Sequence, residues 1–306
     1  MKNMDEKYLN ELFSYYQFII DKKFPFPSFL DKKFKGLLIL ACSGMTIFYG
    51  MDYFDSIFQT LYKTEIHYYK TKLSPHIMKE NISTDFRDQI LNNHLKNIPG
   101  FVSNYYDSND EQVHRTIYLS SYRQSILDLL DIMVHEMNHI VNSKENETFF
   151  LGDHLTYRTG LCYQVDGQKK YFTLEEIYNT LQVEEIIHII RQFSSCSIED
   201  KYLTKLVEQI SKQSKNGFQS AAYQDISSLV RPLFRNPIFH DFVKTERWNG
   251  HLDKIQEQFN YVVGDDVFDT YCSSLDTVNS ESFFGEKPIQ YIRKCTKLYN
   301  SSPRLK

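Results

Sequence analysis

SILDLLDIMVHEMNHIV, residues 125–141, is the stretch that decides the fold. Apolar residues recur along it at intervals of three and four, which predicts a helix with buried faces. Ser125 stands three residues before Asp128, as in a capping box, so we expect the helix to begin there. Alternating and β-branched residues at 113–120 predict a strand just before it. The sequence therefore predicts a strand followed by a long, buried helix.

Within this helix, HEMNH at 135–139 carries the residue types of a metal site. His135 and His139 stand four positions apart, so both imidazoles project from one face and can bind one Zn²⁺ ion. Glu136 lies beside them, where a carboxylate can take a proton from water acidified by the metal and later deliver it to a leaving amine. A surface helix with two stray histidines is the alternative, which the apolar context disfavours, because buried polar groups need partners.

The strand and the HEMNH helix resemble the zincin superfamily of zinc metallopeptidases, and the resemblance spans roughly residues 116–190. It implies an edge strand before the helix and a third zinc ligand from a later segment. The longer form HExxHxxGxxH is absent, since Asn142 and Glu145 stand at its glycine and third histidine. A later helix rich in glutamate is instead similar to the gluzincins, whose third ligand is Glu. Its LEEI run at 174–177 also resembles clostridial neurotoxin light chains.

Glu176 is the predicted third ligand, near the start of a buried helix that begins at Leu174. Thr180 and Glu184 share its face of the helix, where they could orient a histidine ligand. One residue corresponds to a rotation of about 100°, so only one of Glu175 and Glu176 can face the metal. A solvated or salt-bridged side chain is the competing role. The other candidates are Glu175 and Glu184 and, more weakly, Asp153, His154 and Asp166.

The expected fold is α+β and mostly helical, a zincin-like catalytic domain with a small sheet. The first hundred residues read as a helical layer, with helical spacing at Tyr8–Ile20 and from Gly36 to Leu61. Asp166-Gly167 between two strand-like runs predicts a hairpin. Residues 1–197 are expected to form the catalytic domain and 198–306 a C-terminal helical subdomain that closes the cleft.

Composition limits the partners. The net charge of −4 disfavours a nucleic-acid-binding surface, which needs a concentrated excess of Lys and Arg. The apolar run Gly36–Gly50 is shorter than the roughly 20 residues of a membrane span, so a buried helix is expected there. Five scattered cysteines without a CxxC pair disfavour disulfides, and the acidic N-terminus lacks a classical export signal. A reducing cytoplasm is the expected location, with non-classical secretion as an effector the alternative.

Other polar residues favour structural roles. Tyr157 and Arg158 could stabilise an oxyanion, but an ordinary strand pair is the preferred interpretation. His188 and Trp248 are expected in the core. Cys162 and Cys196 lack a paired histidine motif, which excludes a cysteine nucleophile.

Together these features predict a zinc metallopeptidase acting on a peptide or protein substrate. The metal would polarise the scissile carbonyl while Glu136 moves the proton. The alternative is a non-catalytic binding or regulatory protein that retains a zincin scaffold with a structural or vestigial metal site. An intact Glu136 favours the enzyme, because a structural zinc site is filled by four protein groups.

Overall fold

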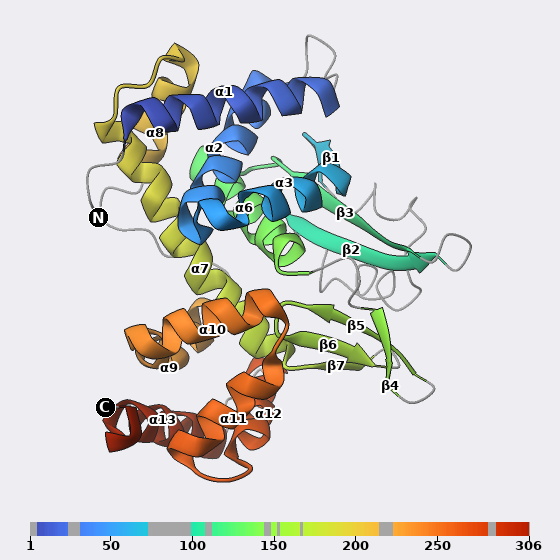
Figure 1. Ribbon diagram of the computed structural model, residues 1–306, viewed down its shortest axis with the longest axis vertical. Helices are drawn as coiled ribbons and strands as arrows, with labels where there is room; N and C mark the ends of the chain where they lie inside the picture. The colour runs from blue at the N-terminus through green and yellow to red at the C-terminus, as the bar shows by residue number, and fades with distance from the viewer. Residues whose placement is uncertain are drawn as a thin grey trace. The chain divides into compact units, whose positions relative to one another are not determined.

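The protein is α+β and mostly helical, as predicted (Figure 1). The computed structural model describes residues 5–23, 31–72, 99–107, 112–143, 148–151, 154–165, 168–213, 223–280 and 286–305. The chain forms two compact units: unit 1 comprises Met1–Val141 and Val183–Phe218, and unit 2 comprises Asn142–Gln182 and Gln219–Lys306. This division does not coincide with the expected boundary at residue 197. Helix α7 (Phe172–Gln192) contributes its first half to unit 2 and its second half to unit 1.

The helices of unit 1 include the predicted N-terminal layer. They are α1 (Glu6–Lys23), α2 (Lys32–Tyr49), η1 (Met51–Tyr53), α3 (Phe54–Lys63), α6 (Ile126–Val141), η2 (Phe193–Ser195) and α8 (Lys201–Gln213). Helix α2 contains the apolar run and is buried along most of its length, which confirms a buried helix there. No single helix among the described residues has the length and apolar composition to cross a membrane. Helix α2 and Met51–Lys63 pass that test only as a pair bent by 117°.

A three-stranded mixed sheet belongs to unit 1. Its order is β1 (Glu65–Tyr69), β3 (Gln112–Ser120) and β2 (Gly100–Asp107), with β1 parallel and β2 antiparallel to β3. Strand β3 confirms the predicted strand before the HEMNH helix. Two expectations were wrong: β1 and the start of β2 fall in the stretch read as helical, and β3 is central among these strands and not at the edge. Both errors have one cause, since pairing with a distant strand, and not local periodicity, fixes these elements.

Helix α6 carries HEMNH and begins with the predicted capping box. The Ser125 N–H donates to Asp128 Oδ2 at 3.1 Å, and the Asp128 N–H donates to Ser125 Oγ at 3.1 Å. The helix packs against α2, α3, α8, β2 and β3. Its Asn138, which has no exposed surface, accepts a hydrogen bond of 2.6 Å from the Tyr49 hydroxyl of α2. These contacts fix the position of α6, most of whose residues are buried.

The sheet of unit 2 is antiparallel throughout. Its order is β4 (Thr148–Leu151), β5 (His154–Thr159), β6 (Cys162–Val165) and β7 (Gln168–Lys170). Val165 pairs with Gln168, so β6 and β7 form the predicted hairpin, although Asp166 and Gly167 lie outside the described residues. Helix α7 follows directly and begins two residues before the predicted Leu174.

Five helices follow among the described residues of unit 2, with the 3-10 turn η3 (Pro303–Leu305) at the end: α9 (Gln224–Phe234), α10 (Pro237–Asn249), α11 (Leu252–Val263), α12 (Val267–Ser280) and α13 (Glu286–Ser301). Gly250 ends α10 with a positive φ of 81°, a conformation that glycine adopts readily at the C-terminus of a helix. One apolar core joins these helices to Ile177 and Tyr178 of α7. This shared core explains why the chain does not divide at residue 197.

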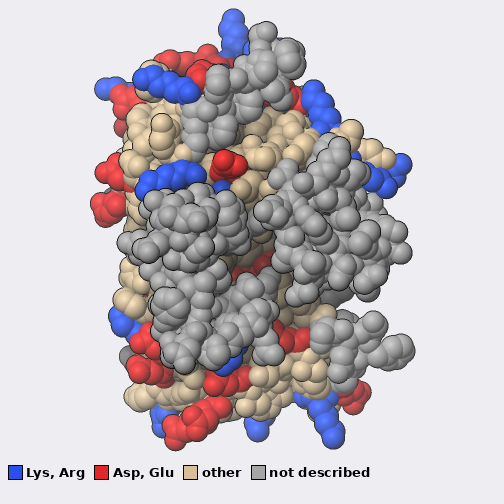
Figure 2. Space-filling model, turned by 90° about the vertical axis from the view of Figure 1, so that its right-hand side faces the viewer, with Lys and Arg blue, Asp and Glu red and all other residues tan. Residues whose placement is uncertain are grey.

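The charged residues on one face of the molecule can be followed in Figure 2. Lys and Arg are interspersed with Asp and Glu over the described residues of this face, without a continuous field of either sign. Interspersed charges of this kind accord with the small net charge of −4.

Candidate metal site

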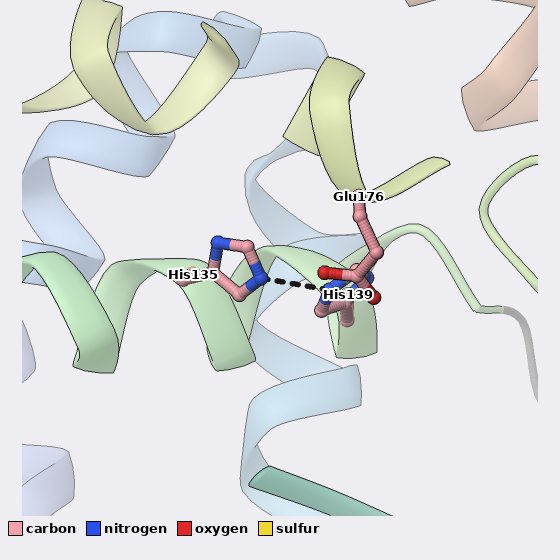
Figure 3. Close-up of side chains that lie close together, drawn as sticks. All are labelled: His135, His139 and Glu176. Atoms are coloured by element: carbon pink, nitrogen blue, oxygen red, sulfur yellow. Dashed lines mark hydrogen bonds between the residues drawn. The ribbon is translucent and has the colours of Figure 1, made fainter. Parts of the chain in front are cut away.

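His135, His139 and Glu176 lie close together, as the sequence predicted (Figure 3). Helix α6 supplies the two histidines and the first half of α7 supplies the glutamate. Each residue offers one ligand atom, and these atoms all lie within 4.8 Å of one another. Three ligands of these types, brought together from segments distant in sequence, form a group that could hold a metal ion.

The two imidazoles face each other through their Nε2 atoms. These atoms are 3.1 Å apart, the ring centroids are 4.8 Å apart and the ring planes differ by 78°. Two nitrogens that share a tetrahedral zinc, each at about 2.0–2.1 Å from it, are separated by about 3.3 Å. A direct hydrogen bond at the same spacing requires that one Nε2 carry a proton. A metal ion between the rings would also have the Glu176 carboxylate within reach as a third ligand.

Burial strengthens the electrostatics of this group. His135 is 9% exposed and His139 is 6% exposed, while Glu176 is partly buried. Charges interact more strongly where water is largely excluded. Two imidazole nitrogens and one carboxylate oxygen are also the donor set of one common class of catalytic zinc site. The residues present therefore fit a zinc ion by type, spacing and burial.

Glu136 is buried on the same helix, with 9% of its surface exposed. Its role as a general base stays a prediction. Glu184 is partly buried and lies outside the three-residue group, while Thr180 donates its hydroxyl to the backbone carbonyl of Glu176 at 2.8 Å. The orienting role expected of Thr180 and Glu184 likewise stays a prediction.

Glu175 lies outside the group of three ligand residues and its carboxylate is bound elsewhere, as expected from the rotation of one residue. It is 1% exposed and forms a buried ion pair with Arg247 of α10. Its carboxylate accepts hydrogen bonds from Arg247 Nε at 2.9 Å and from the Leu161 N–H at 2.7 Å. These donors occupy the carboxylate, so Glu175 is not available as the third ligand.

The remaining candidates have other surroundings. The Arg158 guanidinium is buried and donates to the carbonyl of Arg247 at 3.1 Å and to that of Gly160, which agrees with the structural interpretation. For Tyr157 and His154, the structure describes only the backbone, in β5. Asp153 and Asp166 lie outside the described residues.

Two further expectations concern the core. Trp248 is buried, with 5% of its surface exposed, as predicted. His188 is exposed on α7 and hydrogen-bonded to Gln192 at 2.9 Å, so its assignment to the core was wrong. An almost wholly apolar helix does not show from sequence which narrow stripe stays in solvent. Cys42, Cys196, Cys272 and Cys295 are free thiols.

No protein-family model, curated protein or solved structure matches this chain. The side chains of the site are therefore the evidence for its function. Sequence reasoning missed Arg247, the buried cation of Glu175. The two residues are 72 positions apart, and nothing in the local sequence around Arg247 distinguishes it from a surface arginine.

Proposed function

We propose that this protein is a zinc-dependent metallopeptidase that hydrolyses peptide bonds in a peptide or protein substrate. The observation that carries the proposal is the convergence of His135, His139 and Glu176, whose ligand atoms lie within 4.8 Å of one another. The two histidines belong to an HExxH helix, the motif that combines two zinc ligands with a general base. The third ligand is a glutamate from a later helix, so we place the site in a gluzincin-like scaffold.

The chain's own residues divide the work in this proposal. His135, His139 and Glu176 hold the ion, which supplies Lewis acidity toward a carbonyl oxygen and lowers the pKa of water. Glu136 takes a proton from the attacking water and delivers it to the leaving amine. Burial of Glu136 favours this role, because proton transfer is then less subject to competition from bulk solvent.

A non-catalytic protein with a structural metal is the second candidate. Structural zinc sites use four protein ligands, whereas catalytic sites use three and leave one position open. The group found among the described residues contains three ligand residues, which favours the enzyme. The free thiols of Cys42, Cys196, Cys272 and Cys295 suit a reducing compartment such as the cytoplasm.

Incubation of the zinc-loaded protein with a mixture of unstructured peptides tests the proposal. Mass spectrometry should detect new peptide termini, and a chelator should abolish them. Readdition of zinc should restore cleavage. If the zinc-loaded protein leaves a broad peptide mixture intact, the enzyme assignment fails and the structural-metal candidate takes its place.

A further inference from the structure

Arg247 is a fully buried cation that contacts one face of α7. Its Nε and Nη2 bind the Glu175 carboxylate, its Nη1 donates to Gln182 Oε1 at 2.5 Å, and its Nη2 donates to Asn179 Oδ1 at 3.1 Å. All four side chains are 0–1% exposed. One guanidinium thus binds three residues spread over two turns of the helix.

The spacing of Glu175, Asn179 and Gln182 places them on one face of α7. Positions 175, 179 and 182 lie within about 60° of one another around a helix, whereas position 176 lies about 100° from position 175. The guanidinium is planar and its donors have a fixed geometry. A helix held at three points along one stripe by such a group has little freedom to turn about its axis. The contact therefore sets the direction in which Glu176 leaves α7.

Neighbouring backbone and side-chain groups hold the Glu175–Arg247 ion pair in place. The Leu161 N–H donates to Glu175, and Arg158 donates to the carbonyls of Arg247 and Gly160. Gly160 has a positive φ of 60°, and a methyl group there would overlap the Glu175 carboxylate. Only glycine suits this position, because it adopts the conformation readily and leaves room for the carboxylate.

Stability alone is a weak reason for such an arrangement. Apolar residues of similar volume often replace a buried ion pair without loss of stability, whereas an ion pair favours a particular geometry. Geometry matters at a metal ligand, where bond lengths tolerate about ±0.2 Å. A turn of about 15° moves a side-chain tip about 6 Å from the helix axis by roughly 1.6 Å. The orientation of α7 must therefore be closely fixed if Glu176 is to bind a metal.

We infer that Arg247 is a positioning residue for the metal ligand Glu176, acting through Glu175, Asn179 and Gln182. The inference rests on the proposed metal site but not on peptide hydrolysis. Arg247→Lys keeps the charge and loses the planar set of donors, and Arg247→Met removes the charge. The control is Phe259→Leu, a core change in α11, where Phe259 is 1% exposed and packs on Phe268, Tyr271 and Tyr299.

The experiment measures zinc affinity by competition with a chromophoric chelator, at a temperature where circular dichroism shows every variant to be folded. We expect both Arg247 variants to bind zinc about 10- to 100-fold more weakly than wild type. Loss of a group that supports a metal ligand typically lowers metal affinity by this factor. Phe259→Leu should keep the wild-type affinity despite a lower melting temperature. In the cobalt-loaded Arg247 variants, the visible absorption of a tetrahedral site should weaken. Should Arg247→Met not fold, Arg247→Lys carries the test.

The outcomes separate the two proposals. If the Arg247 variants bind zinc with wild-type affinity, or if Phe259→Leu loses as much zinc affinity as they do, the positioning role alone is overturned. Zinc binding by the wild type without hydrolysis of any peptide would overturn the enzyme and leave the positioning role intact. A wild-type chain that binds no zinc would overturn both.

Discussion

Two acidic sites lie one residue apart at the start of α7, and their surroundings differ. Glu175 is buried within unit 2, where Arg247 and the Leu161 N–H bind its carboxylate. Glu176 is partly buried, and its carboxylate lies with the imidazoles of His135 and His139. Glu175 belongs to a site whose cation is part of the chain. Glu176 belongs to a group whose donors suit a cation from solution.

The difference shows how one helix can separate stability from chemistry. A buried carboxylate requires a compensating cation, and removal of that cation leaves an expensive uncompensated charge. Glu175 therefore contributes to the fold, and its replacement should lower the free energy of unfolding. Replacement of Glu176 should instead mainly weaken metal binding.

The largest effect should follow from Glu136→Gln. Glutamine keeps the shape of the side chain but cannot accept the proton, so the hydrolysis rate should fall by about 10²- to 10⁴-fold. Zinc content and the melting temperature should stay close to those of wild type. A steady-state assay on a cleaved peptide, together with metal analysis, measures both quantities. An undiminished rate in this variant would show that Glu136 is not the general base.

The neighbouring glutamates should respond oppositely to the same substitution. Glu175→Gln breaks the buried ion pair with Arg247 and should lower the free energy of unfolding by about 3 kcal/mol. Glu176→Gln should lower the free energy of unfolding of the metal-free protein by less than about 1 kcal/mol. The same substitution should weaken zinc binding strongly. Urea unfolding of the metal-free proteins gives the first comparison, and chelator competition the second. Equal destabilisation by the two substitutions would remove the distinction between the sites.

Removal of the metal should destabilise the protein only modestly. Binding to the folded state alone stabilises by about 2.7 kcal/mol at a ligand concentration 100 times the dissociation constant. A chain of 306 residues has cores that do not depend on the metal. We expect a chelator to lower the melting temperature by several degrees and leave the circular dichroism spectrum of the folded state intact. Complete unfolding at room temperature would instead indicate a structural site.

Gly160→Ala should give the smallest of these effects. It should act by displacing the Glu175 carboxylate. Alanine at a φ of 60° is strained, and its methyl group would overlap the Glu175 carboxylate, so we expect a loss of about 2 kcal/mol. Gly50→Ala is the matched control: Gly50 also has a positive φ, of 100°, but among the described residues no heavy atom beyond its chain neighbours would lie within 4 Å of a methyl group there. Urea unfolding should show the smaller loss in the control. Equal losses would mean that the carboxylate readily gives way.

Much of the candidate site follows from local patterns in the sequence. The capping box at Ser125, the apolar spacing of α6 and the Asp166-Gly167 signal depend on neighbours a few residues apart. They correctly predicted helix α6, the hairpin of β6 and β7 and, with the apolar run from Leu174, the helix that follows it. The choice of Glu176 over Glu175 required only the rotation per residue, and the structure brings Glu176 to the histidines.

The features that were missed depend on contacts between distant residues. EIHYY at 65–69 forms a strand because β3 pairs with it, and its own periodicity does not show this. The boundary at residue 197 was expected because the helices after it resemble a separate layer. The core of unit 2 instead joins those helices to the first half of α7. Arg247 was missed for the same reason, since its partners lie 65 to 72 positions away.

The metal content of four purified proteins tests the central claim most directly. Wild type, Glu175→Gln, Glu176→Gln and the double variant His135→Ala with His139→Ala are equilibrated with an excess of zinc, freed of unbound metal by gel filtration and analysed by mass spectrometry. We predict one zinc per chain in wild type, one per chain also in Glu175→Gln, which keeps all three ligands and binds zinc more weakly only through the orientation of α7, less than one in Glu176→Gln and none in the double variant. Zinc retained at one per chain in the double variant, or absent from wild type, would contradict the account.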